Sequence, residues 1–449
     1  MPNNAAVEPH AAARMSDAHR EEKMVSRSGV GRRTVLQGLA ASGLASVAGQ
    51  RAAFAAPGTI KIGLVMPQTG ALAFFCEHMP FVLDQVKAKM GGQFANGGAQ
   101  RPYEIIVKDS QSSPNRAAEV TQELLLNDKV DIVATFATPE TTNPVADQCE
   151  LNGVPCVSND APLEPYFFGR HGDPKKGFDW TYHYFFSGDE LVSSLIPFWN
   201  RLPTNKLVGG LWPNDGDGIA QSKGFPVLLN KGGYKVVDPG RFDMPASNYN
   251  AQIAAFKAAG CDIVTGVTPP PEMTTFWNGC AQQGYKPKAV YMGKALEFPA
   301  AIAPMGARAA GLTTEVWWTP TSPFKSSLNG QTSQELADAY EKASGRQWSQ
   351  PLGFRHSLFE VVFDVLKRAQ DLDKAESIRD ALKATKLDTI VGPIDFTKGP
   401  FPNCCLTPLV IGQWLKTPGS KYPFDLIVVD NTNFPQIPVA GKPEVIPYS

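Results

Sequence analysis

The sequence lacks the short motifs that mark several large enzyme classes. After residue 55 it contains no nucleophile elbow, no HExxH helix and no Walker loop, and the glycines of residues 214–218 do not make a GxGxxG fingerprint. The histidines of this part show no metal-ligand spacing; they are His78, His171, His183 and His356. We therefore expect a protein that is not an enzyme, with no metal and no cofactor.

The sequence also lacks an excess of either charge, a membrane-length apolar run and a regular set of cysteine pairs. The 42 Lys and Arg residues nearly balance the 43 Asp and Glu residues, without a basic block or an acidic tail, so no nucleic-acid partner is expected. No apolar run after residue 55 is long enough to span a bilayer. The seven cysteines are an odd number without a CxxC pair, which argues against a disulfide framework and favours buried, unpaired side chains.

Residues 1–55 differ in character from the rest. A polar stretch leads to Arg32-Arg33, then to a mildly apolar segment at 38–49 and to the ending Ala53-Phe54-Ala55. This order predicts a twin-arginine export signal, cleaved after residue 55, and a periplasmic protein. A leader with a chance arginine pair and a retained anchor are the alternatives, and the Ala-x-Ala ending argues against both.

The remaining residues are too many for one ordinary core, so two lobes are expected. Strand-like apolar runs alternate with segments of helical period over 59–165, and this alternation restarts over 191–292. No hairpin signal interrupts either series. We therefore predict an α/β fold of two doubly wound parallel-sheet lobes joined by a multi-strand hinge.

The rest of the chain adds elements to both lobes. Helices are expected at 333–344, 353–369 and 375–385, packed on the first lobe, and late strands at 390–396, 409–415 and 426–429. The predicted boundaries are 56–186 and 313–388 for the first lobe, and 187–312 and 389–449 for the second.

One stretch, residues 130–165, carries the clearest indication of a site. Two apolar runs end in polar residues, with a polar turn at 137–143 and a helix from Pro144 between them. Parallel strands open their carboxyl ends onto one edge, where ligands of open α/β sheets bind. The residues expected to converge there are Thr138, Glu140, Thr141, Ser158, Asn159 and Asp160. The alternative is that these side chains only cap helices and form turns.

The loop Asn214-Asp215-Gly216-Asp217-Gly218 invites comparison with a calcium loop. The position that needs a bidentate glutamate holds Gly224, and Pro213 takes the first ligand position. A turn with an N-cap that faces a cleft is the better interpretation.

Several motifs, in order, resemble one family. They are Ile60-Lys61-Ile62-Gly63-Leu64 with Pro67-Gln68-Thr69-Gly70-Ala71, Pro144-Val145-Ala146 with Val154-Pro155-Cys156-Val157-Ser158, the segment 276–287 with Tyr291-Met292-Gly293, Gly353-Phe354, and Val391-Gly392-Pro393-Ile394-Asp395-Phe396. Their order and spacing resemble the type I periplasmic solute-binding proteins of ABC importers, in the leucine/isoleucine/valine-binding branch. The resemblance implies a small-molecule solute and an ABC permease in the inner membrane as partners, and a monomer.

The resemblance also implies roles for individual residues. First-lobe hydroxyls and amides would grip a carboxylate or amide, at 138–141 and at 158–161, which adds Ala161. Aromatic side chains would cover the ligand, at Phe74 or Phe75 and at Phe354, although each could be plain core. Gln68, Asp215 and Pro270 also match positions of the site in relatives. Trp212 ends a strand that faces the cleft, so it could contact the ligand or be plain core. Lys294 could be an anion clamp and Glu297 could line the site, and for both the alternative is a solvated surface side chain. Relatives that bind amino acids place an acid after the Met-Gly strand end, where this chain has Lys294, so an α-amino-acid ligand is in doubt.

Three functions follow from these observations. The first is an exported solute-binding protein that captures a small amino-acid-like, carboxylate or amide solute between its lobes for uptake. The second is a ligand-sensing receptor on the same scaffold. The third, an exported hydrolase, would have to use Asp160, Asp215 and His356, whose spacing does not single them out.

Overall fold

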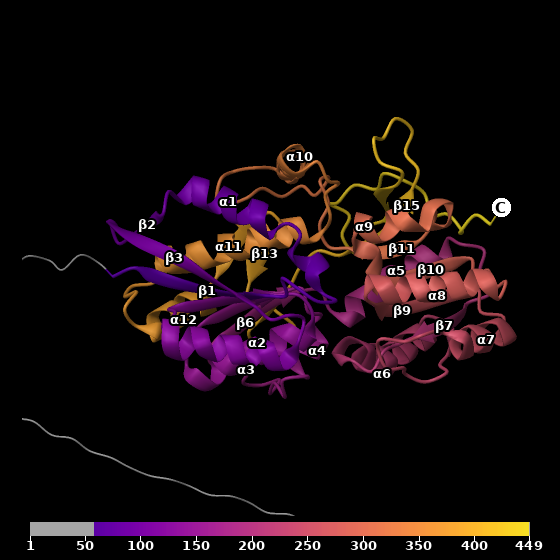
Figure 1. Cartoon of the computed structure of the whole chain (residues 1–449), viewed down its shortest axis with the longest axis horizontal. Coiled ribbons are helices and arrows are strands. Elements are labelled where there is room, and N and C mark those ends of the chain that lie inside the picture. The colour runs from indigo at the N-terminus through magenta and orange to yellow at the C-terminus, as the bar shows by residue number, and fades with distance from the viewer. Residues whose placement is uncertain (1–57, 449) are drawn as a thin grey trace, which may run out of the picture. The chain divides into compact units, whose positions relative to one another are not determined.

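The computed structural model describes residues 58–448, which form two α/β lobes (Figure 1). The predicted export signal lies outside these residues. Each lobe has a seven-stranded sheet, ordered β14-β6-β5-β4-β1-β3-β2 in the first lobe and β16-β15-β11-β10-β9-β7-β8 in the second. The predicted fold class is confirmed. Among the described residues, no helix has the length and apolarity needed to span a membrane.

The first lobe is parallel apart from one edge strand. Its strands are β1 (Ile60–Met66), β2 (Gln93–Asn96), β3 (Ala99–Asp109), β4 (Ile132–Phe136), β5 (Cys156–Asn159), β6 (Thr181–Phe185) and β14 (Cys404–Leu406). Its helices are η1 (Ala73–Cys76), α1 (Met79–Met90), α2 (Pro114–Gln122), η2 (Glu123–Asp128), α3 (Pro139–Asn152), α4 (Leu163–Phe167), α10 (Ser333–Ser344), α11 (Pro351–Arg368) and α12 (Ala375–Lys383), beside the hairpin β12 (Lys386–Thr389) and β13 (Gly392–Asp395). Helices cover both faces of β1 and β3, with α1 and α11 on one side and α2 and α3 on the other (Figure 1).

The second lobe repeats the design. Its strands are β7 (Leu207–Leu211), β8 (Lys235–Val237), β9 (Ile263–Thr268), β10 (Ala289–Lys294), β11 (Thr313–Val316), β15 (Val410–Leu415) and β16 (Asp425–Asp430). Its helices are α5 (Gly188–Asn200), α6 (Gly216–Lys231), α7 (Asn250–Ala259), α8 (Pro270–Gln282), η3 (Ala295–Glu297), α9 (Pro299–Ile302) and η4 (Ala303–Ala309). The last two strands run antiparallel to their neighbours.

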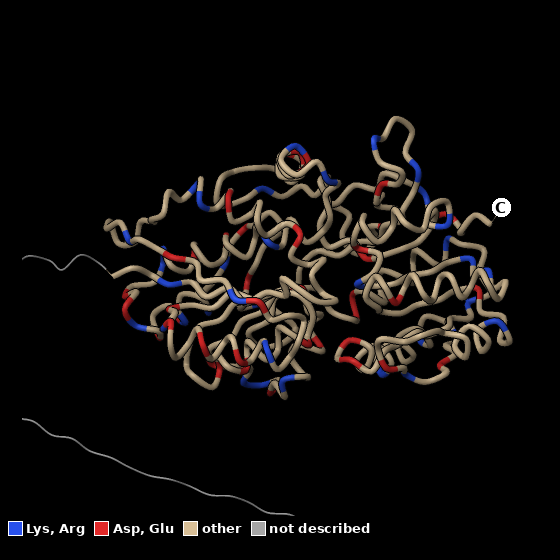
Figure 2. Tube along the Cα trace, viewed as in Figure 1, with Lys and Arg blue, Asp and Glu red and all other residues tan. Residues whose placement is uncertain are grey.

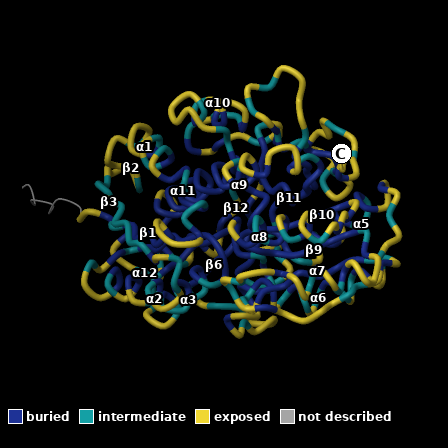
Figure 3. Tube along the Cα trace, turned by 45° about the vertical axis from the view of Figure 1, so that its right-hand side comes forward, coloured by how far each residue is buried: buried dark blue, intermediate teal, exposed yellow. Residues whose placement is uncertain are grey.

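Burial explains why the central strands are continuous apolar runs instead of alternating ones. All of β4 and β9 is buried, because helices lie on both faces of each sheet (Figure 3). Gly63 on β1 lets the helical layer approach closely, since a Cβ there would lie 3.0 Å from the Leu124 side chain. The seven cysteines are all buried and unpaired.

Three segments cross between the lobes, before α5, after β11 and after β14. They meet in one packed hinge: Thr407 donates its backbone N–H to Phe185 O at 3.2 Å, and the rings of Phe185 and Trp317 lie 5.1 Å apart. Trp317 is buried and belongs to the packing of this hinge.

Four local predictions were wrong. No hairpin was expected within 59–165, but β2 and β3 form one over Gly97-Gly98, both with positive φ. Helix α3 starts at Pro139, so Pro144 lies inside it and the expected turn at 137–143 is mostly helical. Strand β11 lies in the second sheet and β14 in the first, each opposite to the lobe expected for its range. The other lobe boundaries stay a prediction.

Candidate functional site

The carboxyl ends of β4 and β5 lie side by side and present polar residues at one edge of the first sheet. Phe136 pairs with Asn159 in this register, and Thr138 is the N-cap of α3. Thr138 and Thr141 are buried, and their hydroxyl oxygens have no hydrogen-bond partner among the described residues. Because buried hydroxyls without a partner are costly, these two are suited to bind a ligand group.

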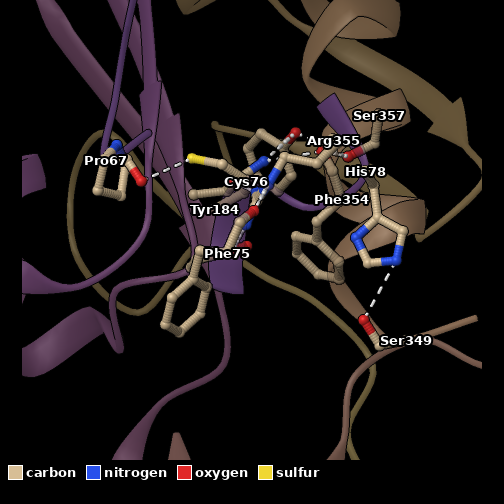
Figure 4. A network of polar contacts seen from close by, with 11 residues as sticks. Pro67, Phe75, Cys76, His78, Tyr184, Ser349, Phe354, Arg355 and Ser357 are labelled. Carbon is tan, nitrogen blue, oxygen red and sulfur yellow. Dashed lines mark hydrogen bonds and ion pairs between the residues drawn. The ribbon is translucent and has the colours of Figure 1, made fainter. Parts of the chain in front are cut away.

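Arg355 of α11, which sequence reasoning missed, ties this edge together (Figure 4). The guanidinium is fully buried, pairs with the Asp160 carboxylate and donates to Phe75 O at 3.0 Å and to Asn159 Oδ1 at 3.2 Å. It also lies over the Phe136 ring, 3.6 Å from its centroid. Burial raises the pKa of Asp160, and Arg355 opposes this rise. Arg355 is the residue after Phe354, which was predicted to line the site, and this adjacency was the only feature of the sequence that pointed to it.

In the second lobe, the start of α6 forms a charged cluster with Lys294. Asp215 is the N-cap of α6 and accepts from Gly218 N at 2.7 Å, which confirms the expected turn with an N-cap. Lys294 Nζ lies 3.0 Å from Asp215 Oδ2 and 2.7 Å from Asp217 Oδ2. Lys294 is therefore a buried ion-pair partner, and Asp217 is a second residue that sequence reasoning missed.

Glu140 connects this cluster to the first lobe. Its Oε1 accepts from Gly216 N of α6 at 2.8 Å, and its Oε2 lies 3.7 Å from Lys294 Nζ. The two helix starts approach so closely that a Cβ at Gly216 would lie 3.3 Å from Pro139 Cβ. Thr138, Glu140 and Thr141 of one lobe are thus brought to Asp215 and Lys294 of the other.

The charged groups of this cluster shift one another's pKa values. Burial opposes the charge of Lys294, but Asp215, Asp217 and Glu140 outweigh it and raise the pKa of the ammonium well above its usual range. Burial raises the pKa of Asp217 to about 7, against the pull of Lys294. For Glu140, Lys294 opposes the effect of burial, and the pKa of that carboxyl is lowered.

A second acidic pair lies behind Lys294. Glu297 accepts from Lys294 N at 3.0 Å, and Lys294 itself has a positive φ of 62°. Glu297 and Glu315 are both buried, and burial together with their mutual repulsion raises the pKa of Glu297 well above its usual range. Glu315 Oε1 and the Tyr291 hydroxyl fill the space above Gly293, each 3.0 Å from where a Cβ would lie.

Aromatic side chains of both lobes meet at the edge of the junction. The rings of Phe74 and Phe75 lie 5.6 Å and 5.1 Å from the ring of Phe298, a second-lobe residue that was not predicted. A cavity of about 620 Å³ opens beside Phe74. It is lined by residues of η1 and α9 and by Trp414 and Phe424. This volume is typical of a small-molecule pocket.

Other predicted site residues have partners within one lobe. Ser158 Oγ bonds to His183 Nδ1 at 2.7 Å, and His183 Nε2 to Ala161 O at 2.7 Å. Asn159 donates to the Tyr184 hydroxyl at 2.8 Å. Gln68 is exposed, and its backbone N–H donates to Asp109 at 2.9 Å.

The remaining three predicted residues are apolar and buried. Pro270 is the first residue of α8. Trp212 has a buried indole N–H without a partner among the described residues. Phe354 packs against Trp317, with 4.8 Å between ring centroids.

The three hydrolase candidates do not come together. Asp160 pairs with Arg355, Asp215 pairs with Lys294, and His356 Nε2 bonds to Ser326 Oγ at 2.7 Å. No two of them contact each other as a base and its orienting acid would. Within residues 58–448, no group of His, Cys, Asp and Glu side chains is arranged to hold a metal ion.

Comparison with known proteins adds a family match. Residues 59–411 match the family described as periplasmic binding protein. The structure resembles the leucine-binding protein LivK of Thermotoga maritima with a TM-score of 0.68 at 17% identity, over 84% of this chain and 99% of that one.

Two further solved structures are similar. A solute-binding protein of an ABC transporter from Rhodopseudomonas palustris, in complex with 3,4-dihydroxybenzoic acid, gives a TM-score of 0.66 at 22% identity, over 84% of this chain and 99% of that one. The branched-chain amino acid transporter substrate-binding protein LivJ of Streptococcus pneumoniae, in complex with isoleucine, gives 0.63 at 18% identity, over 83% of this chain and all of that one. At these identities the likeness shows the fold.

Proposed function

Since the chain belongs to the periplasmic binding protein family, we propose that it is an exported solute-binding protein. It captures a small amino-acid-like, carboxylate or amide solute between its lobes and delivers it to an ABC permease of the inner membrane. It is exported through the twin-arginine pathway and acts in the periplasm as a monomer. The solved relatives in complex with isoleucine and with a dihydroxybenzoic acid support a small organic solute.

The observation that carries the proposal is the set of polar contacts between the lobes. Glu140 reaches across from α3 to Gly216 and Lys294, directly beside the buried hydroxyls of Thr138 and Thr141. A ligand shifts a hinged protein toward the closed form only if it contacts that form better than the open one. A solute held by the two hydroxyls would supply such a difference, because the second lobe covers it only after closure.

The proposal is tested by thermal shift and calorimetry against amino acids, amides and carboxylates. We expect at least one class to raise the melting temperature. Thr141→Val should weaken its binding by about three- to tenfold, the value of one or two neutral hydrogen bonds. Thr417→Val, at an exposed position far along the chain, is the matched control and should leave affinity unchanged.

Native mass spectrometry of protein isolated from its own periplasm provides the second readout. A retained small molecule, lost on denaturation, is the expected result. If neither the solute panel nor native mass spectrometry reveals a bound molecule, the proposed function is wrong.

A further inference from the structure

A small cavity of about 60 Å³ lies between the lobes, where α4 meets α6. The first lobe contributes Pro162, Glu164 and Pro165, and α6 contributes Asp217, Gln221 and Phe225. Since one water molecule needs at least roughly 10–15 Å³ of such space, the cavity has room for a few water-sized groups. An ammonium group and the methylene that carries it are of that size.

Two side chains of α6 line this cavity with unused acceptor atoms. Asp217 is 2% exposed and Gln221 is 9% exposed, and they are four residues apart, on one face of the helix. Asp217 Oδ1 and Gln221 Oε1 are buried and have no hydrogen-bond partner among the described residues. When Asp217 is ionised, both atoms are acceptors, and a donor group that reaches both would satisfy them.

The charge around the cavity has one sign. Glu164 and Asp189 also line it, and none of the residues that line it is a lysine or arginine. Figure 2 shows acidic residues where α4 and α6 face each other. Glu164 is partly occupied, since its Oε2 accepts from Gly188 N at 2.8 Å. Asp217 Oδ2 pairs with Lys294, so Oδ1 is the oxygen of Asp217 that lacks a hydrogen-bond donor among the described residues.

Lys294 does not cancel this negative charge. Its single charge is shared among Asp215, Asp217 and Glu140, which leaves the cluster with an excess of carboxylates. A carboxylate from a ligand would therefore enter an environment that already repels it. A cation would find charge-assisted hydrogen bonds instead.

We propose that this cavity is the subsite for a protonated primary amine of the transported solute, held by Asp217 and Gln221 between the lobes. The inference rests on the proposed function and selects, from the solute classes given there, those that bear an amine. Because Glu164 comes from the first lobe and Asp217 from the second, the amine completes its contacts only when the lobes close.

The test is calorimetry with matched probes that differ in the amine. Putrescine and 4-aminobutanoate carry a primary amine, whereas butanoate, butanamide and 4-hydroxybenzoate do not. We expect an amine probe to bind and the amine-free probes to bind at least about tenfold more weakly, as the loss of a charged hydrogen bond implies.

Three variants assign the effect to the cavity. Asp217→Asn should weaken binding of the amine probe by about tenfold or more, and Gln221→Leu by about three- to tenfold. Glu376→Gln, which removes an exposed carboxylate on α12, should leave it unchanged. If Asp217→Asn does not fold, Gln221→Leu carries the test, because it replaces one neutral side chain by another of similar size.

The two proposals fail in different ways. If amine-free probes bind as tightly as amine probes, or if Gln221→Leu and Asp217→Asn leave amine affinity unchanged, the cavity holds only water and the amine subsite is wrong, while solute binding stands. If no probe binds and protein from the periplasm carries no solute, both are wrong.

Discussion

Replacing Arg355 by methionine should destabilise the protein strongly. The guanidinium and its partner Asp160 are both fully buried, and the substitution leaves that carboxylate without its cation. It also removes the hydrogen bonds to Phe75 O and to Asn159 Oδ1. Breaking a buried ion pair by removing one member costs about 3–5 kcal/mol, and we expect a loss of unfolding free energy in this range near neutral pH.

The double variant Arg355→Met with Asp160→Asn separates the charge effect from the packing effect. Because it removes both charges, it should be more stable than Arg355→Met alone by at least about 1 kcal/mol. Urea unfolding followed by tryptophan fluorescence measures all the values. Arg346→Met is the control, since that arginine is 65% exposed in a surface pair with Glu77, and its loss should cost less than about 1 kcal/mol. A loss below about 1 kcal/mol for Arg355→Met would refute the reasoning.

Three more predictions follow. Glu140→Gln removes the ion pair between the lobes that involves Lys294. Solute affinity measured by calorimetry should therefore fall by about two- to tenfold, and the unfolding free energy should fall by less than about 1 kcal/mol. Unchanged affinity would show that Glu140 does not assist closure. Gly353→Ala should destabilise the protein by about 1–3 kcal/mol, because its Cβ would lie 2.4 Å from the Trp318 ring. Gly224→Ala, whose Cβ would have nothing within 4 Å, should instead stabilise α6 by about 0.5–1 kcal/mol. Melting temperatures equal to that of the wild type would contradict both expectations. Burial lowers the pKa of His356 from 6.5 to about 4, so below pH 6.5 the unfolded chain binds a proton that the folded protein excludes, and the wild type loses stability. From pH 7.5 to pH 5, the unfolding free energy of the wild type should therefore fall by about 2 kcal/mol relative to that of His356→Gln. A difference between the two proteins that stays constant would exclude a neutral buried histidine.

The fold could largely be predicted from the sequence because its signals are local. Continuous apolar runs such as β4 and β9 announce strands covered on both faces, and they alternate with segments of helical period. The placement of β11 and β14 could not be predicted in this way. Strand β14 is short, and its partner β6 lies far away in the sequence. Strand β11 pairs with β10, the strand before it, at a single residue pair, and its longer pairing is with β15, far along the chain.

The candidate site was predictable only in part. Thr138 and Thr141 follow a strand directly, so their position at the sheet edge could be expected. The contact between Glu140 and Gly216 joins residues 76 positions apart, on different lobes, and no local pattern records it. The same is true of Lys294, whose interpretation as a surface residue or anion clamp fails because three carboxylates from distant segments surround it.

The most direct test of the central claim is the distance between the lobes with and without solute. Leu126 in the first lobe and Val227 in the second are 62% and 55% exposed, and all seven native cysteines are buried. Cysteines introduced at these two positions can therefore be spin-labelled selectively, and the distance between the labels measured by double electron–electron resonance. We predict a distance distribution that shortens and narrows when the solute found by native mass spectrometry is added. A distribution that stays the same at saturating solute would contradict capture by lobe closure.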